Sequence, residues 1–128
     1  MGNTIVSVLL VLILVYLLYR MLPAKGVVSI KGTELQEKLA AKKNSGAQFI
    51  DVREPAEYKS GHVPGFRNVP LGQIANRLGE LPKDSEVVLM CRSGSRSMMA
   101  AKILKKNGYQ KIVNVSGGIS QWTGTQVK

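Results

Sequence analysis

The feature that most constrains this chain is an apolar run near its N-terminus. Within residues 4–22 the only charged side chain is Arg20, and residues 5–19 carry no charge at all. As a helix, this run would be about 28 Å long, close to the hydrocarbon thickness of a bilayer, which is roughly 30 Å. The run is apolar on every side, so it lacks the polar face that a helix lying on a membrane surface needs. The sequence therefore predicts one transmembrane helix over residues 1–23.

The charges that flank the run predict its orientation. Basic residues follow it, at Arg20, Lys25 and Lys31, and none precedes it. Because cytoplasmic flanks are enriched in Lys and Arg, we expect residues 24–128 in the cytoplasm, as the soluble part of a single-pass protein of the cell membrane. Pro23 is expected to end the helix.

A cleaved signal peptide is the alternative to a retained anchor. Such a peptide carries basic residues before its apolar run and small residues at a cleavage site after it. Residues 1–4 contain no Lys or Arg, and residues 19–25 form a poor cleavage site. The retained anchor is therefore the favoured interpretation.

Beyond the run, residues 24–128 are long enough for one domain with a core of its own. The chain has 18 Lys and Arg residues and 8 Asp and Glu residues, and only Arg20 of these lies in the run, so the domain carries a net charge of +9. Nucleic acid is not an expected partner, because the domain lacks aromatic residues interleaved with a concentrated basic segment. Attraction to anionic membrane lipid is the simpler use of this charge, and an anionic substrate is a second.

Strand-like and helical segments alternate along the domain, which predicts an α/β fold with a parallel sheet covered on both faces. The expected strands are residues 27–30, 47–52, 68–70, 86–90 and 111–115. The expected helices are residues 33–43, a short one from 55, then 71–78, 97–107 and 119–123. In such a fold, ligands gather at the carboxyl ends of the strands.

Cys91 stands at one of these ends, where the strand over 86–90 gives way to a helix. Small residues fill the connecting loop and allow consecutive backbone N–H groups to converge on one point: Ser93, Gly94, Ser95 and Ser97. The helix N-terminus and the charges of Arg92 and Arg96 also favour an anion there. The loop is therefore expected to stabilise the Cys91 thiolate.

Other chemistries have little basis in this sequence. One Cys and one His cannot build a zinc site of usual composition, so no metal and no cofactor are expected. A single Cys also excludes a disulfide within the chain, which fits a reducing cytosol. His62 lies in a turn sequence, at residues 61–65, where structural hydrogen bonding is the favoured role over catalysis.

Several segments, in order, resemble the signature segments of the single-domain rhodanese family, the thiosulfate sulfurtransferase-like proteins. They are DVRE at 51–54, Glu57 with Tyr58, GHVPG at 61–65, CRSGSR at 91–96, and Gly117 and Gly118 followed by Trp122. The resemblance covers about residues 28–124. It implies a three-layer α/β domain with a central parallel sheet flanked by helices. One departure is Phe66, where a small Ala is usual, and this residue is expected to reshape the floor near the site.

The resemblance also implies a function. Cys91 would carry sulfane sulfur as a persulfide, while Arg96 and the loop amides would hold the anionic donor. Asp51 and Arg53 are expected to form a structural ion pair and hydrogen-bond network, joined by Glu57, rather than to take part in catalysis.

The expected reaction moves sulfur from an anionic donor, thiosulfate or another sulfane-sulfur compound, to cyanide or to a thiol acceptor, which is either a small thiol or a protein thiol. Because the chain has no second Cys, the acceptor must come from outside. A Cys-based phosphatase is one alternative, but those enzymes use C-x5-R, and Cys91 to Arg96 is C-x4-R. A membrane-tethered docking or regulatory module without catalysis is the other, because a fold does not fix a function.

Overall fold

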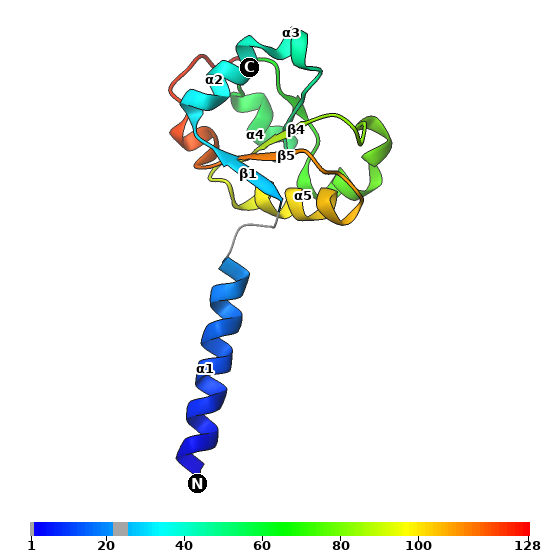
Figure 1. Cartoon of the computed structure of the whole chain (residues 1–128). Helices are drawn as coiled ribbons and strands as arrows, with labels where there is room; N and C mark the ends of the chain where they lie inside the picture. The colour runs from blue at the N-terminus through cyan, green and yellow to red at the C-terminus, as the bar shows by residue number, and fades with distance from the viewer. Residues whose placement is uncertain (1, 22–25) are drawn as a thin grey trace.

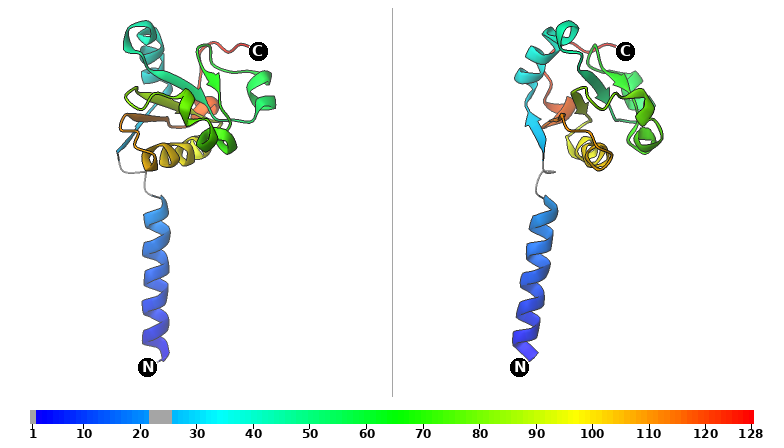
Figure 2. Two further views of the ribbon diagram at one scale, coloured as in Figure 1. Left: turned by 90° about the vertical axis from the view of Figure 1, so that its right-hand side faces the viewer. Right: turned by 45° about the vertical axis from the view of Figure 1, so that its right-hand side comes forward.

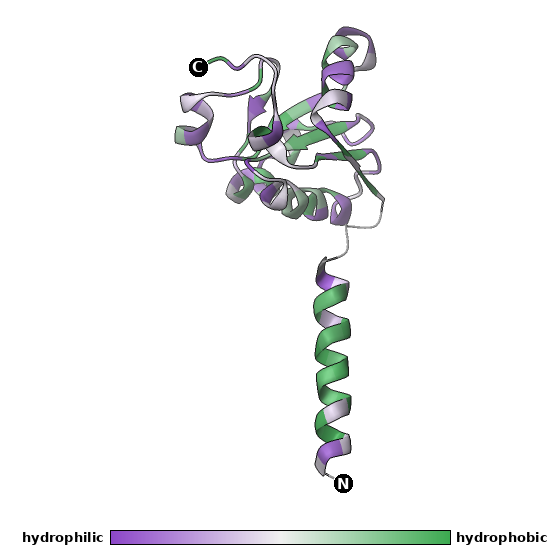
Figure 3. Cartoon of the chain, turned by 90° about the vertical axis from the view of Figure 1, so that its left-hand side faces the viewer, coloured by the Kyte–Doolittle hydropathy of each residue, from purple (hydrophilic) through white to green (hydrophobic). Residues whose placement is uncertain are grey.

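The computed structural model describes residues 2–21 and 26–128 (Figure 1). Its first element is α1 (Gly2–Met21), which is long and apolar enough to cross a membrane and is not buried against the rest of the chain. A signal sequence meets the same description. Figure 3 shows that this helix is mostly green (apolar), with purple only near its two ends, beside the mixed colours of the domain. The expected helix end at Pro23, the basic flank at Lys25 and the domain boundary after residue 23 lie outside the described residues.

Five parallel strands form the single sheet of the domain, in the order β1-β5-β4-β2-β3. The strands are β1 (Val27–Ile30), β2 (Gln48–Asp51), β3 (Arg67–Asn68), β4 (Val87–Met90) and β5 (Ile112–Val115). In the centre, Val88 of β4 lies opposite Val113 of β5. The expected central parallel sheet is confirmed, and all the strand ends that precede helices lie at one edge.

Helices cover both faces of this sheet, which makes three layers (Figure 2). They are α2 (Gly32–Ala40), α3 (Lys42–Ser45), α4 (Pro55–Ser60) and α5 (Ser95–Lys106), with the 3-10 helices η1 (Leu71–Asn76), η2 (Leu78–Glu80) and η3 (Gly118–Gln121). On one face, Leu104 of α5 and Ile74 of η1 pack with Leu89. On the other, Leu35 of α2 packs with Val88.

Four expected helices differ from those observed. α5 begins at Ser95 rather than at residue 97, and the last turn, η3, covers Gly118–Gln121 rather than residues 119–123. The other two differences are larger. The helix expected over residues 33–43 begins at Gly32, because the Glu34 carboxylate accepts a hydrogen bond from the Lys31 amide at 3.4 Å. This helix is also interrupted, so that α2 and α3 are separate helices. The expected α-helix over residues 71–78 is instead the pair of 3-10 helices η1 and η2. Gly72 lies within this segment and Gly79 follows it, and both are poor helix formers, so short 3-10 turns replace a continuous α-helix there.

Gly118 fixes the start of η3 against the loop that follows β4. Its φ of +54° is in the left-handed region, and a Cβ atom at this position would overlap the Cys91 carbonyl oxygen and lie 2.7 Å from the carbonyl carbon of Arg92. The close approach lets the amides of Ile119 and Ser120 donate to the carbonyls of Cys91 and Arg92, at 2.9 and 3.0 Å. A glycine is therefore required to hold this loop in place.

Gly118→Ala is expected to destabilise the protein by about 2 kcal/mol or more, because alanine adds both backbone strain and an overlap with the loop. The matched control is Gly79→Ala, since Gly79 has open space around its Cα and no left-handed φ. Chemical denaturation of the full chain in detergent micelles measures both changes. Equal stabilities for the two variants would contradict this account of Gly118.

Candidate functional site

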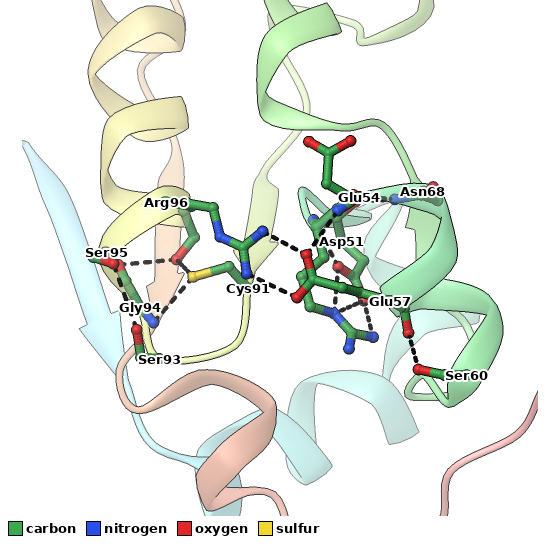
Figure 4. Close-up of polar contacts among 12 residues, drawn as sticks. Asp51, Glu54, Glu57, Ser60, Asn68, Cys91, Ser93, Gly94, Ser95 and Arg96 are labelled. Atoms are coloured by element: carbon green, nitrogen blue, oxygen red, sulfur yellow. Dashed lines mark hydrogen bonds and ion pairs between the residues drawn. The ribbon is translucent and has the colours of Figure 1, made fainter.

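The Cys91 thiol lies beneath the loop that joins β4 to α5 (Figure 4). Only 1% of the residue is exposed. Its Sγ accepts a hydrogen bond from the Gly94 amide at 3.0 Å and lies 3.4 Å from the Ser97 hydroxyl. Gly94 directs its amide back toward the sulfur with a φ of +104°, a conformation that side chains disfavour. The loop thus brings hydrogen-bond donors to one sulfur atom, as its small residues predict.

The surroundings of this sulfur act on its pKa in opposite directions. Burial raises the pKa of the Cys91 thiol, because it disfavours the charged form. Hydrogen bonds from the Ser97 side chain and from the amides of Ser97, Gly94 and Ser93 lower it, and the net pKa is below the ordinary value. The arrangement can therefore hold negative charge on sulfur without a neighbouring base.

Arg92 has a smaller place in this arrangement than its position in the sequence suggests. Its side chain is exposed, and it takes part in none of the hydrogen bonds or ion pairs recorded among residues 2–21 and 26–128. Hydrogen bonds within the loop, rather than the charge of Arg92, account for the lowered pKa of Cys91. Ser95 is also exposed, and its hydroxyl lies 3.4 Å from that of Ser93.

Asn114 of β5 supports the loop, a role that the expectations from sequence do not include. Its side-chain amide donates to the Gly94 carbonyl at 3.3 Å, and its oxygen accepts from the Ser97 hydroxyl. The Ser97 hydroxyl also lies 3.0 Å from the Gly94 carbonyl, so one proton faces three acceptors once the sulfur is ionised. Asn114 is the only polar residue in the apolar strand β5, and this pattern could have indicated its role from sequence. In the structure it is only 4% exposed, so its polar side chain needs partners.

Arg96 is held by a carboxylate across the site. Its guanidinium donates two hydrogen bonds to Glu57 of α4, at 2.7 and 3.0 Å. This contact from Arg96 is the main cause that lowers the pKa of Glu57 to about 2, against the opposing effect of burial. Above that pH the Glu57 carboxylate stays ionised and the pair remains intact. The Glu57 carboxylate accepts its hydrogen bonds from Arg96 and from the Glu54 amide, so the expectation that it joins the hydrogen bonds of Asp51 and Arg53 is wrong.

Asp51 and Arg53 form the expected structural ion pair. The Arg53 side chain donates to both Asp51 oxygens, at 2.9 to 3.1 Å, and both residues are almost fully buried. Arg53 also donates to the Gly61 carbonyl at 2.8 Å, and Asn68 donates to the backbone carbonyls of Asp51 and Arg53. The pair therefore ties the end of β2 to the loops beside it, as a geometric support of the site.

His62 and Phe66 have structural contacts. The His62 ring stacks on Tyr58 with centroids 3.7 Å apart, and its Nδ1 lies 2.9 Å from the Tyr58 carbonyl oxygen. Phe66 packs edge-on against Phe49 within the core. Across the part of the chain that the structure describes, no group of three or more His, Cys, Asp or Glu residues could hold a metal ion.

Comparisons with known proteins agree with this geometry. The family model described as "Rhodanese-like domain" matches residues 33–125. The chain is 47% identical over 78 residues to the uncharacterized protein YqhL of Bacillus subtilis. This match covers 61% of the present chain and 62% of YqhL. The chain is also 42% identical over 74 residues to a sulfurtransferase of Allochromatium vinosum, and this match covers 58% of the chain and 69% of that protein. The chain also spans 41% of the length of YrkF of Bacillus subtilis, so these relatives extend beyond the matched segment.

A solved structure shares the fold. The rhodanese-like domain protein of Staphylococcus aureus superposes with a TM-score of 0.70 at 31% sequence identity. The match covers 79% of this chain and 98% of that one. The α/β domain described above therefore corresponds to nearly the whole of a protein that forms this fold.

Ser97→Ala is expected to raise the pKa of the Cys91 thiol, because it removes a hydrogen bond to the thiolate. A hydrogen bond to a charged group contributes about 1.5 kcal/mol, so at a pH below the titration midpoint the thiolate population should fall about tenfold. The ultraviolet absorbance of the thiolate as a function of pH measures this, with Cys91→Ser as the blank. Ser93→Ala is the matched control, since its hydroxyl contacts Ser95 and not the sulfur. A midpoint that does not move in Ser97→Ala would refute this role.

Proposed function

Because the chain belongs to the rhodanese-like domain family, we propose that it is a sulfurtransferase in which Cys91 carries the transferred sulfur as a persulfide. One observation carries the proposal: the only thiol of the chain stands at the carboxyl end of β4 and accepts a hydrogen bond from the Gly94 amide at 3.0 Å. The matching of a sulfurtransferase from Allochromatium vinosum supports the same reaction class.

In the first half of the proposed reaction, the Cys91 thiolate attacks the outer sulfur of an anionic donor such as thiosulfate. A sulfur–sulfur bond forms to Sγ, the bond between the two donor sulfurs breaks, and sulfite leaves with its electron pair. Cys91 is left as a persulfide anion. The amides of Ser93, Gly94 and Ser97 lie where they stabilise negative charge on sulfur, so they act on the thiolate before transfer and on the persulfide after it.

In the second half, an external thiolate or cyanide attacks the outer sulfur of the persulfide. The new bond forms to the acceptor, the bond to Sγ breaks, and the Cys91 thiolate is regenerated. The sequence has no other Cys, so both acceptor classes come from outside the chain. The cycle needs no metal, no cofactor and no net oxidant, since each sulfur–sulfur bond that breaks is replaced by a new bond to sulfur.

Arg96 is proposed to orient the anionic donor. Its guanidinium is pinned by Glu57, and the Cys91 charge contributes to raising the Arg96 pKa, which places the two groups within electrostatic reach. A guanidinium that is already held in one position loses less conformational entropy when it binds the donor than a freely rotating side chain would lose. Glu57 is thus a positioning residue in this proposal.

A non-catalytic docking module is the second candidate, and the burial of Cys91 favours it. A thiol that is 1% exposed presents little sulfur to a donor without movement of the loop above it. Direct detection of the loaded cysteine decides between the two candidates.

After incubation of the full chain with thiosulfate, its intact mass is expected to rise by the mass of one sulfur atom. Cyanide should then remove the added mass with release of thiocyanate. Cys91→Ser should lack the added mass and lower the turnover at least about a thousandfold, because it removes the nucleophile. Absence of the adduct from the wild-type chain, or full turnover by Cys91→Ser, would end the sulfurtransferase proposal.

We further propose that α1 is retained as a membrane anchor and that residues 24–128 lie in the cytoplasm. The described helix has the length and the apolar character to span a bilayer, and Arg20 lies in its last turn. The positive-inside tendency then places the domain on the cytoplasmic side.

Alkaline extraction of membranes is expected to leave the chain in the pellet, because only integral segments resist it. The intact mass of the recovered protein should equal that of the full 13.9 kDa chain. Protease added to intact cells should leave the domain uncut, and protease added after permeabilisation should cut it. A shorter chain that has lost its first residues would show a cleaved signal peptide instead.

A further inference from the structure

The outer face of α5 is basic and is not used by the proposed reaction. Its exposed positions beyond the first turn are Met99, Lys102, Lys105 and Lys106, which we name the α5 basic face. The recorded ion pairs of residues 2–21 and 26–128 involve none of these three lysines. The apolar face of α5 is buried in the core, so the lysines on its exposed face are the groups that can be attracted to anionic lipid headgroups.

Asp and Glu are absent from the part of the domain sequence that follows residue 86 and contains α5. Every charged side chain of α5 is therefore basic. Glu86 itself pairs with Lys38 at 2.8 Å, and Asp84 is adjacent to Lys83 in the sequence. The excess charge of the domain is therefore concentrated on its C-terminal half.

The α5 basic face also lies beside the point where the chain enters the domain. A Cβ atom placed on Gly26 would be 2.5 Å from the Lys105 Nζ, so this ammonium lies directly over the residue before β1. Figure 1 shows the end of α5 next to the start of β1. Only five residues lie between Met21 and Val27, so the six steps from one Cα to the other reach about 20 Å at most. A membrane that holds α1 is thus within reach of these lysines.

We propose that the α5 basic face docks onto the anionic headgroups of the leaflet in which α1 is anchored. This inference rests on the proposed anchor. Docking holds the Cys91 loop close to the membrane surface, because α5 begins at Ser95 in that loop and its twelve residues span about 18 Å. The occupant is a bilayer rather than a soluble anion, since the tether keeps lipid at a high effective concentration.

The test uses the full chain in nanodiscs of phosphatidylcholine alone or with phosphatidylglycerol. A spin label at Met99→Cys, in a Cys91→Ser background, reports its access to a water-soluble relaxation agent. The label should be protected in the anionic discs and accessible in the neutral ones, and high salt should restore access. A label at Ala41→Cys, on an exposed site after α2, should stay accessible in both.

Charge reversal identifies the face. Lys102→Glu, Lys105→Glu and Lys106→Glu together should lower the docked-to-undocked ratio at least about a hundredfold, since each lysine near an anionic surface contributes about fivefold and each glutamate adds repulsion. The matched triple variant reverses three exposed lysines elsewhere and should dock normally: Lys43→Glu, Lys59→Glu and Lys128→Glu. Circular dichroism confirms that both variants fold.

Each remaining outcome is decisive. Equal protection of the Met99→Cys label in both lipids, equal access in both, or equal loss in both triple variants would overturn the proposal. Access in both lipids combined with binding of soluble polyphosphate would reassign the face to a soluble polyanion. Failure of the chain to co-elute with neutral discs in high salt would instead show that α1 is not a membrane anchor. Sulfur loading of Cys91 is measured in a separate experiment and does not depend on the anchor or on the docking.

Discussion

Parallel pairing of the five strands is the constraint from which the site follows. Because every strand runs in one direction, β2, β4 and β5 all deliver their carboxyl ends to one edge of the sheet. The pairs Asp51 with Met90 and Leu89 with Asn114 bring these ends into register. Asp51, Cys91 and Asn114 are far apart in sequence, and the parallel sheet brings them to the same edge.

The burial of Cys91 and the lowered pKa of its thiol belong to the same arrangement. Removal of water would by itself favour the neutral thiol. Here the loop amides and the Ser97 hydroxyl replace water with fixed donors, and the pKa falls in spite of burial. Preorganised donors of this kind stabilise charge without reorganising during a reaction.

Much of this site could be predicted from sequence because its signals are local. The apolar run before Cys91 predicts a buried strand, the small residues after it predict a tight loop, and Asp51 and Arg53 are close enough in sequence to pair as expected. The Glu57–Arg96 pair joins residues 39 positions apart. From sequence alone, Arg53 and Arg96 are chemically equivalent partners for Glu57, so only the fold decides between them. Asn114 reaches Ser97 across 17 positions through the sheet, a contact that only the tertiary fold creates.

The depth of Cys91 has a further consequence for encounters between two copies of the chain. A disulfide requires the two sulfur atoms to come within about 2 Å of each other. Each Cys91 is covered by its own loop, so the loops of both copies must move before the two sulfurs can meet. Contact between two folded copies is therefore not sufficient to form a covalent dimer.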